Sequence, residues 1–164
     1  MSEDHLEEER HALESDAEDL LPPRNRMVIS LLALLGFLIS LYMLSYALGF
    51  TGSVMCGIGD CEAVQTSPYA RIGPMPVAAF GATGYLLLMV VSLLGLQPRA
   101  VRSRLVSMAL LGGAGLGVAF TAYLTYLEAF VINAWCQWCV GSAIIMTLAL
   151  LACLPEVRRL GNAQ

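Results

Sequence analysis

Residues 134–154 read AWCQWCVGSAIIMTLALLACL, a run of 21 residues without Asp, Glu, Lys or Arg. A helix rises about 1.5 Å per residue, so this run would reach roughly 30 Å, the thickness of the hydrocarbon core of a bilayer. Cys136 and Cys139 stand near its start, with one tryptophan before them and another between them. The stretch therefore predicts a membrane-spanning helix whose first turn carries a Cys-x-x-Cys pair.

Three other apolar runs have a similar length, in a chain of 164 residues that is 57% hydrophobic and only 13% charged. None of the runs contains a charged residue, and Glu128 directly follows the third. The sequence is not that of a soluble domain. We expect an all-α membrane protein, a four-transmembrane-helix bundle with an outer lid loop. The four predicted spans are Met27–Phe50, Pro76–Leu96, Leu105–Leu127 and Ala134–Leu154.

The N-terminus has a different composition, because residues 1–21 hold nine acidic side chains and one arginine. Such a segment cannot bury a core, so we expect residues 1–23 to form a disordered acidic tail, either regulatory or merely solvated. A cleaved signal peptide is not indicated, since the first apolar run is full length and no basic segment precedes it. One membrane domain, residues 24–159, and a short tail, residues 160–164, would complete the chain.

Arginine is distributed unevenly between the links. Arg71 is the only basic residue of the links at 51–75 and 128–133. The positive-inside rule therefore places both termini and the 97–104 link in the cytoplasm, and the cysteine pairs outside. In a bacterial inner (plasma) membrane the outside is the oxidising periplasm, where disulfides persist. The arginines on the predicted inner side are Arg24, Arg26, Arg99, Arg102, Arg104, Arg158 and Arg159.

The outer link at 51–75 is longer than a connection between neighbouring helices requires. Its CEAVQTS segment, residues 61–67, predicts about two turns of helix that Pro68 would end. A loop of this length usually has a function, and it could fold back as a lid over the mouth of the bundle.

Four cysteines at the outer end, Cys56, Cys61, Cys136 and Cys139, allow three interpretations. They could be inert packing residues, or form a four-cysteine zinc site, which the spacing permits. They could also relay electrons by thiol–disulfide exchange, the interpretation favoured by two close pairs in an oxidising compartment. Amide groups at a helix start favour the thiolate, so the Cys-x-x-Cys pair should be reactive. Cys153, at the inner end, is expected to be a small packing residue.

A cysteine pair embedded in a membrane needs an electron acceptor that lives there, and a lipid-soluble quinone is the obvious candidate. The sequence shows no haem-ligation pattern, nucleotide-binding loop or flavin fingerprint, and nothing indicates a nucleic-acid partner. His5 and His11 lie in the acidic tail, which excludes histidine chemistry at the outer face.

These features together resemble the vitamin K epoxide reductase family and its bacterial homologues, over most of residues 27–154. The likeness rests on Cys56 and Cys61, on Ser67 six residues later, on GPMPVAAFG before the second span, and on the Cys-x-x-Cys of the fourth. It implies a quinone-dependent thiol oxidoreductase with menaquinone or ubiquinone as acceptor. The electron donor would be a thioredoxin-like periplasmic protein, expected to be a separate chain because no such domain follows the fourth span.

The resemblance also implies a role for each site residue by position. Cys56 would meet the partner protein, and Cys61 would exchange with Cys136. Cys139 would react with the quinone, and Ser67 would support the site by hydrogen bonding.

Two positions separate this chain from the mammalian branch of that family. Mammalian members have a tyrosine four residues after the second Cys-x-x-Cys cysteine and an asparagine early in the second span. Ala143 and Val77 stand at the matching positions here, which favours plain quinone reduction over epoxide reduction.

Overall fold

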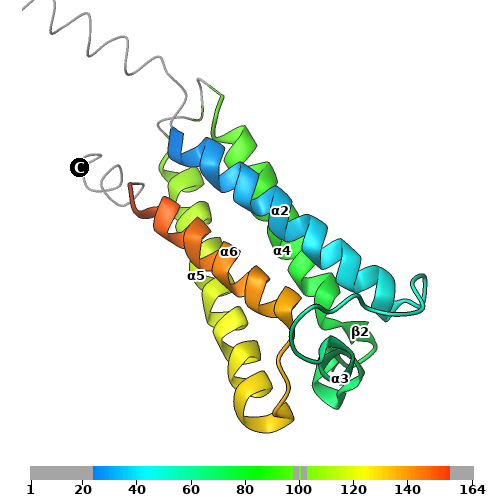
Figure 1. The fold of residues 1–164 in the computed structure, drawn as a ribbon. Coiled ribbons are helices and arrows are strands. Elements are labelled where there is room, and N and C mark those ends of the chain that lie inside the picture. The colour runs from blue at the N-terminus through cyan, green and yellow to red at the C-terminus, as the bar shows by residue number, and fades with distance from the viewer. Residues whose placement is uncertain (1–23, 98–99, 101–102, 156–164) are drawn as a thin grey trace, which may run out of the picture.

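A computed structural model of the chain describes residues 24–97, 100 and 103–155. The acidic tail, residues 160–164 and Arg99, Arg102, Arg158 and Arg159 lie outside the described residues. The fold is mostly helical, as expected, and its four long helices run side by side (Figure 1). They are α2 (Arg24–Ala47), α4 (Val77–Leu94), α5 (Arg104–Leu127) and α6 (Gln137–Ala152).

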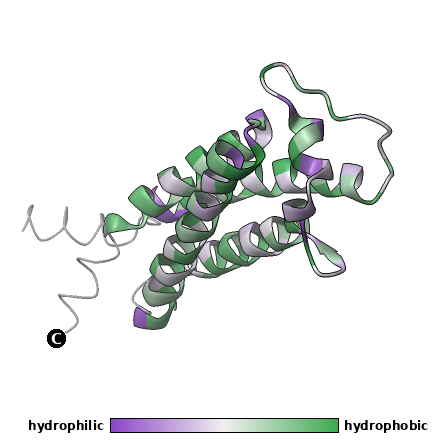
Figure 2. Ribbon diagram, turned by 90° about the horizontal axis from the view of Figure 1, so that it is seen from below, coloured by the Kyte–Doolittle hydropathy of each residue, from purple (hydrophilic) through white to green (hydrophobic). Residues whose placement is uncertain are grey.

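Among the described residues, three stretches are long and apolar enough to cross a membrane: Arg24–Ala47, Val77–Leu94 and Arg104–Ile132. The last of these joins α5 to a π-helical turn, η2 (Glu128–Ile132). At 16 residues, α6 is also apolar but reaches only about 24 Å. A fourth crossing therefore stays a prediction. Figure 2 shows that the ribbons of the long helices are coloured mostly as hydrophobic, with the strongly hydrophilic residues mainly towards their ends and in the links.

The four helices pack in a ring, in which α2 and α5 each contact both α4 and α6. Tyr85 of α4 is buried at the centre, and its hydroxyl bonds to the Ser142 carbonyl of α6 at 2.8 Å. A Cβ atom at Gly36 would overlap the Tyr85 ring, so the small residue lets α2 approach α4 closely. The core consists of Ile29, Ala33, Tyr85, Leu88, Leu110, Ala114, Met146, Ala149 and Cys153.

One arginine of the predicted cytoplasmic side has a structural role at the end of the bundle where α2 begins. Arg26 is fully buried, and its guanidinium donates to the Gly95 carbonyl at 2.6 Å and to Ser107 Oγ at 3.3 Å. Ser92 Oγ in turn donates to the Arg26 carbonyl at 2.6 Å. These bonds join α2 to α4 and α5. A buried charge is tolerated only with such partners.

The outer link contains small elements of its own, at the end of the bundle where α6 begins (Figure 1). The predicted helix is confirmed as α3 (Cys61–Thr66); Asp60 caps it by accepting the Ala63 N–H at 2.9 Å. Ser67, predicted as the last residue of this helix, is instead extended because it precedes Pro68, and a 3₁₀ turn, η1 (Pro68–Ala70), follows. A hairpin of β1 (Arg71–Ile72) and β2 (Met75–Pro76) was not predicted; it pairs Arg71 with Pro76 and Ile72 with Met75.

The four long helices differ from the predicted spans by one to three residues at most of their ends. The first helix starts at Arg24 and ends at Ala47, before Gly49 adopts a positive φ of 82°. The second starts at Val77 because Pro76 is held in β2. The last starts at Gln137, three residues later than predicted, since the backbone before it pairs with the outer link.

Candidate functional site

The outer link reaches the start of α6 through its backbone. Gly59 pairs with Cys136 as an isolated antiparallel bridge, and the Asp60 N–H donates to the Trp135 carbonyl at 2.8 Å. Gly59 has a φ of 87°, and a Cβ atom there would overlap the Trp135 carbonyl. Only glycine suits this position without strain. The chain therefore brings the segment between the first two cysteines against the second pair.

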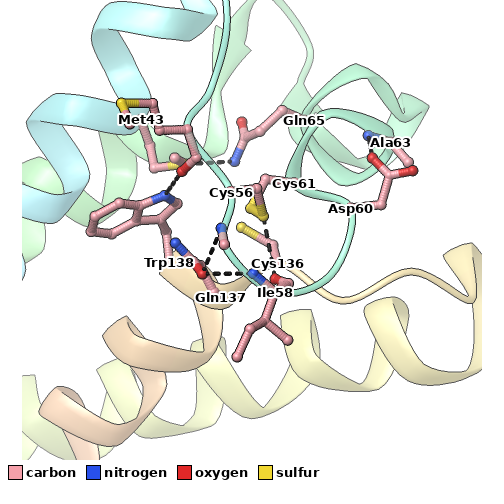
Figure 3. The surroundings of a disulfide bond; sticks show 12 residues. Met43, Cys56, Ile58, Asp60, Cys61, Ala63, Gln65, Cys136, Gln137 and Trp138 are labelled. Carbon is pink, nitrogen blue, oxygen red and sulfur yellow. Dashed lines mark hydrogen bonds between the residues drawn. A yellow bond between two sulfur atoms is a disulfide. The ribbon is translucent and has the colours of Figure 1, made fainter.

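Gln137, the first residue between the cysteines of the Cys-x-x-Cys pair, holds the loop that follows Cys56. Its side-chain Oε1 accepts the backbone N–H groups of Gly57 and Ile58, both at 3.0 Å (Figure 3). A side chain from inside the Cys-x-x-Cys motif thus holds the backbone that follows Cys56.

Trp138, the second residue between those cysteines, holds the same loop at Met55, the residue before Cys56. Its Nε1–H donates to the Met55 carbonyl at 2.9 Å (Figure 3), and its ring stacks at a tilt on Tyr42 with centroids 5.1 Å apart. The Tyr42 hydroxyl accepts the Met55 N–H at 2.9 Å. The tryptophan inside the motif therefore ties the loop to both α2 and α6.

All four outer cysteines lie in one cluster of packed side chains. Cys56 and Cys61 form a disulfide with a Cα–Cα distance of 5.9 Å, whereas Cys136 and Cys139 are thiols. Cys61 and Cys136 are both fully buried, and the Cys136 thiol points towards the disulfide (Figure 3). Cys153 lies in the core directly after the end of α6, where its thiol donates to the Leu110 carbonyl at 3.8 Å.

Cys136 caps the start of α6 with an extended backbone and is hydrogen-bonded to Cys139. That side-chain hydrogen bond is the main cause that lowers the pKa of the Cys136 thiol; burial opposes the shift, and the backbone N–H groups of Cys139 and Trp138 add to it. The sequence predicted a reactive thiol from the helix start alone. The hydrogen bond from the Cys139 thiol lowers the pKa of Cys136 more than the backbone N–H groups at the helix start do.

Glu128 was not predicted to belong to the site, yet it contacts both cysteines of the second pair. Its side chain is only 3% exposed, and Oε2 accepts the Cys136 N–H at 3.2 Å. The carboxylate also forms a side-chain hydrogen bond with Cys139. The available signal was a single acidic residue directly after an otherwise uncharged apolar run.

A cavity of about 150 Å³ opens beside Cys139, between α2, α3, α4, α5 and α6. Apolar side chains form most of its lining, and Glu128, Ser67 and Ser142 supply polar atoms. Within the described residues, no group of three or more His, Cys, Asp or Glu side chains is arranged to hold a metal ion. The zinc interpretation therefore gains no support from this part of the chain.

The sequence was compared with known protein families. It matches the model of the Vitamin K epoxide reductase family over residues 27–154, more than half of the chain. The chain belongs to the vitamin K epoxide reductase family. Membership implies a membrane thiol oxidoreductase, as the resemblance indicated.

Both cysteine pairs and Ser67 lie inside the residues matched to the vitamin K epoxide reductase family. Ser67 Oγ donates to the Val64 carbonyl at 2.7 Å, at the end of α3, and the residue also lines the cavity. Val77 lines the same cavity. Its side chain offers no hydrogen bond to a ligand there.

Proposed function

We propose that this membrane thiol oxidoreductase passes electrons from a separate thioredoxin-like periplasmic protein through two cysteine pairs to a membrane quinone. The observation that carries the proposal is the contact between the pairs. A disulfide, Cys56–Cys61, and a thiol pair, Cys136/Cys139, lie in one cluster, with Cys61 and Cys136 buried together. Such an arrangement suits exchange between the pairs without release of a soluble carrier.

The order of the two pairs follows from their exposure. Cys56 is half-buried. It lies between Met55 and Ile58, and the side chains of these two residues are 79% and 81% exposed. A protein partner can reach this loop, and its thiolate would attack the disulfide at Cys56. A second thiol of the partner would release Cys56, and Cys61 would attack Cys136 of the oxidised second pair, which frees the Cys139 thiolate. Cys56 would then form its disulfide with Cys61 again and release Cys136, so that two electrons have moved to Cys136/Cys139.

The quinone, as substrate, would accept two electrons and two protons. The cavity beside Cys139 fits such a molecule because its lining is mostly apolar and has a few hydroxyl and carboxyl groups. Cys139 reaches this cavity, whereas Cys136 is fully buried. We assign Cys139 as the quinone-facing thiol on that ground. Ser67 would help to hold the outer link in place from the cavity wall.

The proposed location is the bacterial inner membrane, with both termini in the cytoplasm and both cysteine pairs facing the periplasm. The arginine distribution supports this orientation. Residues 24–159 would form the catalytic membrane domain, and the outer link would act as a lid.

Complementation tests the proposal in a cell. The gene would be expressed in a bacterium that lacks its quinone-linked disulfide oxidase, and disulfide formation would be scored in an exported reporter protein. We expect formation to be restored, and Cys139→Ala to abolish the restoration at an equal protein level. Equal reporter oxidation with Cys139→Ala would contradict the assignment.

A further inference from the structure

Glu128 is unusual among the acidic residues of the described part of the chain. Asp60 and Glu62 are exposed, whereas Glu128 is buried at the end of a helix long and apolar enough to cross a membrane. An ionisable side chain at such a place costs free energy unless its partners compensate, and it commonly marks a functional site.

The partners of Glu128 are the groups that react. The Cys136 N–H and the Cys139 side chain both bond to its carboxylate. The Cys139 thiol also bonds to the Cys136 sulfur, so its single proton has two possible acceptors. Cys139 thus lies between the sulfur of Cys136, with which it would form a disulfide, and the Glu128 carboxylate.

The backbone around Glu128 fixes the carboxylate in this position. The helix changes to a π-helical turn at Glu128 and ends at Asn133, which has a φ of 55°. The Glu128 carbonyl accepts the N–H groups of Asn133 and Ala134. π-Helical turns are frequent at functional sites, where they redirect a side chain.

Few other groups near Cys139 could take its proton. The titratable side chains that line the same cavity are Tyr69 and Tyr85, and the Tyr85 hydroxyl is already bonded to Ser142. The chain has no lysine, and its histidines are at positions 5 and 11. The cavity wall is otherwise largely apolar, so bulk water is a poor acceptor there.

We propose that Glu128 accepts the proton of Cys139 when the second cysteine pair reduces the quinone; this rests on the proposed function. The Cys139 S–H bond breaks, and an O–H bond forms on the Glu128 carboxylate. The deprotonated sulfurs of Cys136 and Cys139 join in a disulfide and release two electrons to the quinone. The Glu128 proton passes to one quinone oxygen. The other quinone oxygen takes up a second proton, which balances the proton released by Cys136. Glu128 is then a carboxylate again.

The test compares Glu128→Gln with wild-type enzyme in lipid nanodiscs. Glutamine keeps the size of the side chain and an acceptor for the Cys136 N–H, but cannot accept a proton at neutral pH. Quinone reduction by dithiothreitol should fall by about 100-fold or more, with an unchanged KM for quinone, and the pH profile should change. Glu128→Asp, which keeps the carboxylate, should recover part of the rate.

A second measurement needs no quinone. Alkylation of Cys139 is followed against pH in the reduced enzyme by mass spectrometry of its peptide. Loss of the neighbouring negative charge in Glu128→Gln should move the alkylation midpoint to lower pH. Glu62→Gln, an exposed glutamate of α3, is the matched control and should leave the midpoint unchanged.

Two outcomes would overturn the proposal. Full turnover in Glu128→Gln would show that no proton passes through this carboxylate. A loss of turnover with an unmoved Cys139 midpoint would show that Glu128 only positions the α5–α6 turn. If wild-type enzyme fails to reduce quinone, the proposed function is wrong, and the alkylation midpoint still decides whether a charged Glu128 acts on Cys139.

Discussion

Gln137→Ala should loosen the loop that follows Cys56. The glutamine accepts two backbone N–H groups, from Gly57 and Ile58, each at 3.0 Å. A hydrogen bond contributes about 0.5–1.5 kcal/mol net, and both of these are solvent-exposed, so water partly replaces them in the variant. We expect opening of the loop to become easier by about 1–2 kcal/mol, a factor of about 5–30 in the ratio of open to closed loop.

Hydrogen–deuterium exchange of peptides that cover residues 57–58 measures this ratio directly. Exchange should accelerate by that factor in Gln137→Ala, while peptides from the buried parts of α4 and α5 exchange as in wild type. Transfer of electrons from the first pair to the second should slow, because the closed loop is what brings Cys61 near Cys136. The matched control is Gln97→Ala, an exposed glutamine at the opposite end of the bundle. If exchange at residues 57–58 does not change, Gln137 does not hold the loop closed.

Three further predictions address other parts of the site. Gly59→Ala should strain the backbone bridge to Cys136 by about 1–3 kcal/mol. Electron transfer between the pairs, measured by quenched-flow alkylation, should slow, and a wild-type rate would contradict a role for the backbone pairing. Ser67→Ala removes the 2.7 Å hydrogen bond to the Val64 carbonyl. It should slow quinone reduction, at a normal protein level, by an amount equivalent to roughly 1–3 kcal/mol of activation free energy. Unchanged turnover would show that the serine is only a local cap. On intact reduced cells, a membrane-impermeant thiol reagent should label Cys56 but not Cys153, and labelling only after permeabilisation would reverse the proposed orientation.

Much of the fold can be predicted from local sequence properties. Long uncharged runs predict apolar helices, and the segment from Cys61 to Pro68 predicts a short helix with a defined end. The start of α6 could not be predicted in this way, because the extended backbone of Cys136 depends on pairing with Gly59 in a distant part of the chain. Helix propensity and hydropathy carry no information on such a contact.

The site was predictable where chemistry shows in residue type, and not where it depends on tertiary contacts. Four cysteines in two close pairs on the predicted periplasmic side favour thiol exchange, although their spacing alone also permits a zinc site. Gln137, Trp138 and Glu128 act through hydrogen bonds to the outer link or to the second pair, and each has a common alternative role. A glutamate after an apolar run, for example, usually marks only the end of a span.

If electrons pass directly between the two pairs, a disulfide between Cys61 and Cys136 must form during the transfer, and it can be trapped. The double variant Cys56→Ala/Cys139→Ala leaves these two thiols without their usual partners. A disulfide requires Cα atoms within about 7 Å, which the shared buried cluster favours. After mild oxidation and non-reducing digestion, mass spectrometry should find the peptides of Cys61 and Cys136 joined by a disulfide. If both cysteines remain as thiols that can be alkylated once the protein is unfolded, the pairs do not meet and the relay is wrong.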